Sequence, residues 1–477
     1  NKSILFNSGL LTDEIKNATS NDLVLVVCAI DEYRAKLALD KAEQLLKAKP
    51  VQEEHGEKRP KTVRSALSLN PDVNMSVISV AGRYAANEAW EALRHGLHVL
   101  LFSDNVSLED EIALKKYAHE RGLFLMGPGA GTAIINGVAL GFANVLPRGP
   151  VGIVSAAGTG LQEVSTLIAR HGVGISQGIG TGGRDLKMEV GGMMMLQGLQ
   201  FLQQDPETTV IVLISKPPAE EVARSILAQA SYTEKPVVAC FLGGNFETIP
   251  RTSNVTLART LQECSLLASD AVQPEQGKGQ LFLETEQQCL KAIAEEPKKA
   301  LKTSQRYLRG LFSGGTLCYE AQVVWKDMQI SPVHSNAPLP GNQPLPDSSK
   351  SIGHTAVDLG EEEFTVGRPH PMIDNDLRIR RLLQEARDPE TAVIMLDVVL
   401  GYGAHPDPVS KLGPAIIQAC DLAKASGREL NVVASVTGTE GDPQGLAQTI
   451  ACLEEAEVII CSSNASAARL AGMIVSI

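Results

Sequence analysis

The sequence predicts an α/β protein that contains three doubly wound parallel-sheet domains. The chain has 477 residues, which is too long for one hydrophobic core. Short apolar runs rich in Val, Ile and Leu alternate with longer helical patterns, and this alternation is typical of parallel sheets with crossover helices. Many of the runs lack alternating polar residues, as expected for strands that are covered on both faces.

The apolar runs give the expected strands, and helices are expected between them. The segment 107–121 illustrates a helix, because Ser107 is a candidate N-cap and Asp110 follows three residues later. The expected strands are 23–30, 76–80, 98–102, 123–126, 151–155, 210–215, 237–242, 307–312, 392–399, 431–435 and 458–461.

Two breaks divide the chain. Residues 147–150 read Pro-Arg-Gly-Pro before a strong strand, and residues 273–305 are charged, Gln-rich and helical or linker-like. We therefore predict domains at 1–148, 149–270 and 305–477, with a linker at 271–304. The segment 331–351, rich in Pro, Ser and Asn, is expected to be an exposed loop.

Composition excludes several classes of protein. The net charge of -12 argues against sequence-independent nucleic-acid binding. The longest apolar run has about eight residues, whereas a membrane-spanning helix needs roughly 20. The eight cysteines are scattered singly and form no Cys/His cluster with zinc spacing, so we expect free thiols, no metal site and a cytoplasmic location.

Two loops share one pattern of strand, Gly-Thr turn and helix, each with a Glu four residues after the Thr. Such a turn presents backbone N–H groups and a helix N-terminus, which together attract an anion. A tight turn with a hydroxyl cap is the alternative, but the repetition favours an anion site. The candidate anion-binding residues are Ser155, Gly158, Thr159 and Gly160 in the first loop, and Ser313, Gly314, Gly315 and Thr316 in the second.

Three further loops are candidates for substrate contacts. The Gly-rich stretch 178–185 carries Gly182, Gly183 and Arg184, and a guanidinium can fork onto a carboxylate or phosphate. A flexible loop is an equally good reading of this stretch. Polar, Pro/Gly-rich loops at 367–374 and 397–408 contribute Arg368, His370 and Asp397. These loops are either functional or ordinary turns that satisfy backbone groups.

These motifs resemble the FdrA family of acyl-CoA-synthetase-like proteins, within the succinyl-CoA synthetase superfamily. The resemblance covers nearly the whole chain and rests on residues 103–110, 126–128, 151–163, 180–192, 215–219 and 365–374. It implies a Rossmann-like CoA-binding-type domain at 1–148, followed by two flavodoxin-like succinyl-CoA synthetase-type domains at 149–270 and 305–477. The family usually has a further segment before residue 1, so we expect the start to be missing.

The resemblance also gives the two anion loops a common target. In the synthetases, two helices, one from each subunit, face each other across a phosphohistidine, and residues 155–163 and 312–320 are similar to their N-terminal loops. The candidate catalytic residues are then Glu163, Arg184, Glu320 and His370, with Gly182, Gly183, Arg368 and Asp397 as substrate-binding residues.

Departures from the synthetases shape the expected function. The stretch 243–250, which follows the strand where the α subunit carries its phosphohistidine, has no histidine, and ATP-grasp elements are absent. The family is associated with purine and allantoin breakdown, and FdrA-like proteins are implicated as a subunit of an oxamate carbamoyltransferase. We therefore expect an enzyme subunit that handles a carbamoyl or similar acyl phosphate.

Two alternatives remain open. The first is an ADP-forming acyl-CoA synthetase, or a CoA-binding subunit, that works with a nucleotide-binding partner. The second is a non-catalytic scaffold, which the presence of Glu163, Arg184 and Glu320 disfavours. We expect no required cofactor, with CoA or phosphate as a ligand. We also expect an oligomer with other subunits of the same operon, and no nucleic acid or membrane among its partners.

Overall fold

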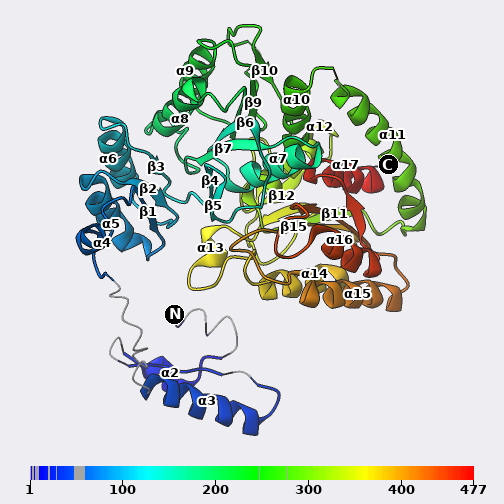
Figure 1. Ribbon diagram of the computed structural model, residues 1–477. Helices are drawn as coiled ribbons and strands as arrows, with labels where there is room; N and C mark the ends of the chain where they lie inside the picture. The colour runs from blue at the N-terminus through cyan, green and yellow to red at the C-terminus, as the bar shows by residue number, and fades with distance from the viewer. Residues whose placement is uncertain are drawn as a thin grey trace. The chain divides into compact units, whose positions relative to one another are not determined.

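The computed structural model describes residues 2, 5, 10–19, 22–27, 29–47, 60–246, 248–275 and 277–476. The chain folds as two compact units, Asn1–Pro71 and Asp72–Ile477 (Figure 1). Among the residues that the structure describes, no helix combines the length and the apolar character needed to span a bilayer.

The first unit contains helices in its described residues and corrects one prediction. Its helices are α2 (Asp13–Asn17), α3 (Glu32–Lys47) and α4 (Val63–Leu69). The strand expected at 23–30 is wrong for residues 23–27, 29 and 30, which have no strand structure, while residue 28 lies outside the described residues. Leu23 is 71% exposed, and an apolar run forms a strand only when a neighbouring strand accepts its backbone hydrogen bonds.

The second unit begins with a three-stranded parallel sheet. Its order is β1-β2-β3, formed by Met75–Ile78, His98–Leu101 and Leu125–Met126. Helices α5 (Gly82–Arg94) and α6 (Leu108–His119) connect these strands. The predicted N-cap is confirmed, because Oγ of Ser107 accepts a hydrogen bond from the N–H of Asp110 at 3.0 Å.

A seven-stranded sheet follows, in the order β10-β9-β8-β6-β7-β4-β5. Its strands are parallel except for the hairpin strand β4, which pairs antiparallel with β5 and β7. Strands β4 and β5 of this sheet precede residue 148, and β6 begins at it. The strands are β4 (Thr132–Ile135), β5 (Val138–Gly141), β6 (Arg148–Ser155), β7 (Ile175–Gly180), β8 (Val210–Ser215), β9 (Val237–Phe241) and β10 (Val255–Leu257).

Successive residues of this sheet face opposite helical layers. Ile153 packs in one core with Leu161 of α7 and Leu261 of α10, whereas Val154 packs in another with Leu199 of α8 and Ile226 of α9. The sheet is therefore doubly wound, as the unbroken apolar runs predict. The helices are α7 (Gly158–Arg170), α8 (Met193–Gln204), α9 (Glu220–Ala230) and α10 (Leu261–Val272).

A second seven-stranded sheet, wholly parallel, has the order β13-β12-β14-β11-β15-β16-β17. Its strands are β11 (Tyr307–Phe312), β12 (Val333–Ser335), β13 (Gln343–Pro344), β14 (His354–Asp358), β15 (Thr391–Val399), β16 (Asn431–Thr437) and β17 (Ile459–Cys461). Helices α12 (Gly315–Asp327) and α17 (Asn464–Val475) pack on one face, and α14 (Asp376–Arg387), α15 (Val409–Ala425) and α16 (Leu446–Glu455) pack on the other. Helices α11 (Gly279–Ala300) and α13 (Glu362–Thr365) complete the unit.

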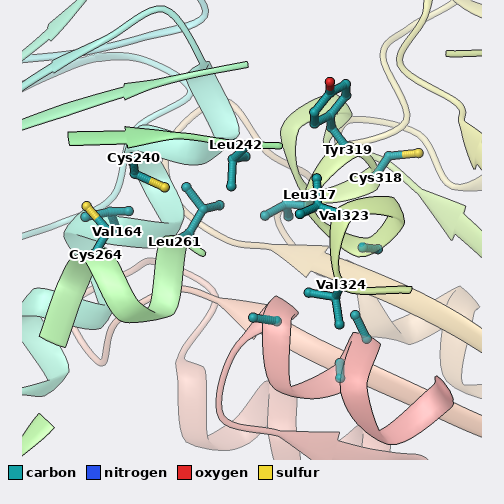
Figure 2. Packing of buried hydrophobic residues seen from close by; sticks show 14 of the residues in the cluster. Val164, Cys240, Leu242, Leu261, Cys264, Leu317, Cys318, Tyr319, Val323 and Val324 are labelled. Atoms are coloured by element: carbon teal, nitrogen blue, oxygen red, sulfur yellow. The ribbon is translucent and has the colours of Figure 1, made fainter. Parts of the chain in front are cut away.

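One hydrophobic core joins the two large sheets. It contains residues of α7 and α10 from one sheet and of α12 and α17 from the other. Figure 2 shows Leu242 and Leu261 on the side of the core that faces Leu317 of α12. Because the two helical layers share this core, α7 and α12 are held against each other.

The predicted fold class is confirmed in the second unit. Each strand predicted from residue 76 onward overlaps an observed strand, and among the named strands of the described residues antiparallel pairing involves only β4 with β5 and β7. The segment 331–351 is not only a loop, because it contains the short strands β12 and β13. They were missed because strands of two or three residues leave no periodic pattern. The three predicted domain ranges remain predictions.

Candidate functional site

A cleft of 740 Å³ lies where strands of all three sheets of the second unit end. Residues 79–82 and 102–105 follow β1 and β2, residues 156–159 follow β6, and residues 313–316 follow β11. The carboxyl ends of parallel strands are where open α/β sheets bind ligands. The cleft is therefore the candidate functional site.

Two helix N-termini meet at this cleft. Gly158 and Thr159 of α7 and Gly315 and Thr316 of α12 line it, as the repeated Gly-Thr loops predict. In the described residues, no acceptor is present for the N–H groups of Gly158, Thr159 and Gly160. The N–H groups at 315–317 likewise have no acceptor in the part of the chain that the structure describes. The paired helix ends carry partial positive charge and suit a dianion.

The second loop is built around a buried carboxylate. Asp397 on β15 accepts hydrogen bonds from the N–H of Ser313 at 2.7 Å, from Oγ of Ser313 at 2.9 Å and from the N–H of Gly314 at 2.8 Å. These N–H groups are therefore not available to a ligand, which corrects their predicted role. Asp397 is fully buried and does not line the cleft, so its role is to shape the loop rather than to bind substrate.

Two cationic side chains lie on the cleft wall. Arg368 was predicted, whereas Lys216 was missed. Neither has an ion-pair partner within the described residues. Lys216 follows the last residue of β8, and Nζ lies 5.6 Å from the ring centre of Tyr319 on α12. Its position after a buried strand was the signal that could have identified it.

Asp358 is a second residue of the cleft that sequence reasoning missed. It ends β14 and is 3% exposed. Oδ1 accepts a hydrogen bond from the N–H of Gly360 at 2.9 Å, and Oδ2 lies so close to Gly315 that a Cβ there would be 2.4 Å away. Burial raises the pKa of the carboxyl group to about 7, although the charge of Lys216 lowers it.

His370 lies in the cleft as predicted. Burial lowers the pKa of its imidazole to about 4, so the ring is neutral near pH 7. Nδ1 accepts a hydrogen bond from the N–H of Met372 at 3.2 Å, and the proton of the neutral ring is therefore on Nε2. Nε2 lies against Gly360, as does Asp358 Oδ1. Near pH 7, His370 can thus donate a hydrogen bond as a neutral ring.

The two predicted catalytic glutamates lie behind the cleft, not in it. Asn464, at the start of α17, donates its N–H to Oε1 of Glu163 at 2.9 Å and its Nδ2 to Oε2 of Glu320 at 2.8 Å. Glu163 also accepts from Thr437, and Glu320 accepts from the N–H of Leu261 at 2.6 Å. Both carboxyl groups are buried. They join the helices of the shared core, and neither can touch a ligand in the cleft.

Arg184 is also engaged within the fold. Its Nε lies 2.7 Å from Oε2 of Glu111, and it donates to the carbonyl of Val106 at 2.8 Å. Glu111 further pairs with the fully buried Lys115 at 2.9 Å, and Lys115 pairs with Asp185 at 2.8 Å. This network joins α6 to the loop after β7. Arg184 was predicted to face a ligand, but it does not line the cleft.

The remaining predicted residues divide between the cleft and its support. Gly183 lines the cleft, whereas Gly182 packs against Pro128 and Gly160 packs against Ile214 and Thr316. Oγ of Ser155 accepts a hydrogen bond from the N–H of Ala157 at 3.0 Å and shapes the turn. In the described part of the chain, no three His, Cys, Asp or Glu side chains are placed to hold a metal ion.

The stretch without histidine lies outside the cleft. Residues 243–246 line a separate cavity of 410 Å³ together with Arg259 and Lys326. This cavity and the cleft share no residue. The helix N-termini of α7 and α12 therefore face a different space from the loop after β9.

Comparison with known proteins places this chain in a family. Residues 311–474 match the family model described as "CoA-ligase", and residues 1–62 match "AllF, heavy metal-associated domain". The chain is 46% identical to the uncharacterized protein YahF of Escherichia coli strain K12, over 99% of this chain and 90% of that protein. It is 32% identical to the succinate–CoA ligase [ADP-forming] subunit alpha of Methanothermobacter thermautotrophicus, over 36% of this chain and 58% of that protein.

A structural relative is the dinucleotide-forming acetyl-coenzyme A synthetase 1 of Ca. Korarchaeum cryptofilum, with a TM-score of 0.36, 15% identity and coverage of 88% of this chain and 86% of that chain. The parallel sheets and the CoA-ligase match define an acyl-CoA-synthetase-like protein of the succinyl-CoA synthetase type. The chain belongs to the FdrA-like family of these proteins.

Proposed function

We propose that this chain binds carbamoyl phosphate, or a closely similar acyl phosphate, in the cleft and acts as a subunit of an oxamate carbamoyltransferase in purine and allantoin breakdown. The observation that carries the proposal is the pair of helix N-termini. Residues 158, 159, 315 and 316, whose N–H groups have no acceptor in the described residues, lie on one cleft with Lys216. This arrangement suits a phosphate-sized dianion.

Two other residues of the cleft, His370 and Arg368, suit the carbonyl group of carbamoyl phosphate and the carboxylate of oxamate. The neutral ring of His370 offers an Nε2–H donor for a carbonyl oxygen on which negative charge develops. The guanidinium of Arg368, which has no ion-pair partner in the described residues, suits the carboxylate of oxamate. Phosphate then leaves the carbonyl carbon as the amide nitrogen of oxamate attacks it.

The chain's own residues favour direct transfer over a phosphoenzyme route. The stretch 243–250 contains no histidine, and its described residues 243–246 line a separate cavity. A direct transfer needs two substrates held side by side and donors aimed at the developing charge. It needs no covalent relay through this chain.

Acyl-CoA synthesis is the second candidate, and one observation favours it. Residues 311–474, which include the α12 side of the cleft, match the "CoA-ligase" family model, and a relative is named as the alpha subunit of a succinate–CoA ligase. In this case a partner would supply the nucleotide site. The cleft would then hold the phosphate of an acyl phosphate before CoA attacks it.

Phosphate release distinguishes the two functions. The full chain is incubated with the subunits encoded beside it, first with carbamoyl phosphate and oxamate, and separately with ATP, CoA and succinate. We expect phosphate release that requires oxamate and ignores CoA, and no turnover by the chain alone. Acyl-CoA formation with a labelled phosphoenzyme on this chain would instead establish the ligase.

A matched pair of glycine variants ties the activity to the cleft. Gly315→Val places a side chain where even a Cβ would meet Oδ2 of Asp358 at 2.4 Å, so oxamate-dependent release should be lost. Gly413→Ala in α15 serves as the control, because no atom lies closer than 4.0 Å to its Cβ position. Full activity of Gly315→Val would contradict the placement of the reaction in this cleft.

A further inference from the structure

Asp358 is a buried carboxyl group on a cleft that is suited to anions. It is 3% exposed and ends β14, and Oδ1 is fixed by the N–H of Gly360. Oδ2 has no hydrogen-bond donor in the described residues and lies beside Gly315, the first residue of α12. One carboxyl oxygen is therefore held in place, and the other is free at the end of the helix that would hold phosphate.

The reaction proposed above requires a proton acceptor within reach of the attacking nitrogen. An amide nitrogen that attacks a carbonyl carbon must lose a proton as the new bond forms, and a positioned group with a pKa near the working pH is best suited to take it. His370 is a poor acceptor, because the pKa of its ring is about 4. Glu163 and Glu320 do not line the cleft.

We propose that Asp358 is the general base of this cleft and that Lys216 is the positioning residue that keeps its carboxylate available. The inference rests on the proposed function. The nitrogen of oxamate forms a bond to the carbonyl carbon of carbamoyl phosphate, while the C–O bond to phosphate breaks and phosphate keeps the electron pair. Oδ2 of Asp358 takes the proton from nitrogen and passes it to the departing phosphate, so carboxylate and charge are restored.

The surroundings of Asp358 fit this role. Burial, together with the charges of Glu361 and Asp397, raises the pKa of its carboxyl group to about 7. Lys216 and the N–H of Gly360 act in the opposite direction. The nearby thiol of Cys318 is kept protonated, because burial raises its pKa well above its ordinary value. Near pH 7, Asp358 is therefore present both as the carboxylate and as the protonated acid. A general base must pass between these two forms in each turnover.

Sulfate binding tests the titration without any turnover. Sulfate is a dianion that does not titrate between pH 5.5 and 9, so a change in its affinity for the full chain reports a protein group. We expect the affinity to fall about tenfold as the pH rises through roughly 7, because a carboxylate forms beside the anion. Asp358→Asn should bind sulfate with little pH dependence, since its amide stays neutral.

Two neighbours should move the midpoint of this titration in opposite directions. Lys216→Met should raise it by roughly one pH unit, because a stabilising positive charge is lost, and Glu361→Gln should lower it. Lys187→Met is the control, since Lys187 is exposed and away from the cleft. A wild-type affinity that does not change with pH, or an Asp358→Asn variant that keeps the change, would overturn the assignment.

Turnover separates this inference from the proposed function. Asp358→Asn should lose at least about 100-fold in oxamate-dependent phosphate release while it still binds sulfate at pH 6. The acidic limb of kcat/KM against pH should shift upward in Lys216→Met. If the wild type transfers and Asp358→Asn transfers equally well, Asp358 is not the base. If the wild type does not transfer, the proposed function fails, and the role of Asp358 in it fails as well.

Discussion

Gly314 lies directly against Thr159, so that a Cβ atom at Gly314 would be 2.9 Å from Cγ2 and 3.0 Å from Oγ1 of Thr159. Gly314 directly precedes α12, which packs on one large sheet. Thr159 is the second residue of α7, which packs on the other. This contact joins the two helix N-termini into one cleft. A side chain at Gly314 would force them apart.

Gly314→Ala should weaken sulfate binding by tenfold or more, because the two sets of N–H groups would no longer face one ligand. The cost of overpacking is about 1–3 kcal/mol in unfolding free energy, so the fold should survive. Isothermal titration and thermal unfolding measure the two effects. The control Gly413→Ala replaces a helical glycine whose Cβ position makes only ordinary contact, with the carbonyl oxygen of Cys452 at 4.0 Å, and unchanged sulfate affinity in Gly314→Ala would contradict the shared site.

Replacement of Asp397, whose carboxylate shapes the second loop, should lower the free energy of unfolding substantially. Asp397 and Arg378 are both buried, with Nη1 of Arg378 3.1 Å from Oδ1 of Asp397. Asp397→Asn leaves the guanidinium without its counter-charge, and we expect a loss of about 3–5 kcal/mol in urea unfolding.

A double-mutant cycle checks this interpretation. Asp397→Asn combined with Arg378→Met should cost less than the sum of the single changes, because no unpaired charge stays buried. The exposed pair Arg224–Glu220, at 3.0 Å, gives the comparison. Glu220→Gln should cost no more than about 1 kcal/mol, and additive single effects at Asp397 and Arg378 would contradict the coupling.

Glu320 should make a contribution to stability that falls as the pH rises from about 4.5 to 7, whereas His354 and His370, whose pKa values burial lowers to about 4, contribute with the opposite sign. Burial raises the pKa of the Glu320 carboxyl group from 4.5 to about 7. At Glu320 the folded chain therefore binds more protons than the unfolded chain in this window, and ionisation destabilises the fold as the pH increases. Asp358 contributes with the same sign.

Glu320→Gln should remove this contribution, so that the stability of the variant relative to the wild type rises with pH across the window. The effect is on the order of 3 kcal/mol at most between the two ends of the window. Urea unfolding at pH 5 and pH 8 measures it, and Glu295→Gln on the exposed surface of α11 is the control. A profile of Glu320→Gln that remains parallel to that of the wild type would show that Glu320 does not titrate in this range.

Arg368 should select the carboxylate substrate rather than the phosphate. Arg368→Met should raise KM for oxamate at least tenfold, as expected for a lost charge-assisted hydrogen bond, with a smaller change in sulfate affinity. Arg368→Lys should recover only part of the loss, because an ammonium cannot fork onto a carboxylate. The exposed Arg380 of α14 provides a control in Arg380→Met, and equal loss for both ligands would place Arg368 at the phosphate instead.

Local pattern in the sequence determined much of this protein. Continuous apolar runs indicate buried strands of five or more residues, such as β8 and β9. The two Gly-Thr loops indicate helix N-termini. The position of residues 158–159 and 315–316 at two helix N-termini on one cleft could therefore be predicted, as could a polar loop that carries Arg368 and His370. These features depend on residues close together in the chain.

The tertiary structure alone decided which polar residues face a ligand. Glu163, Glu320, Arg184 and Asp397 looked like site residues, yet each is held by partners distant in sequence, such as Asn464 and Glu111. Asp358 and Lys216 had no motif of their own, but the packing of two sheets around one shared core brings them to the same cleft. A charged side chain is functional or structural according to its neighbours in space, and burial by those neighbours also sets its pKa.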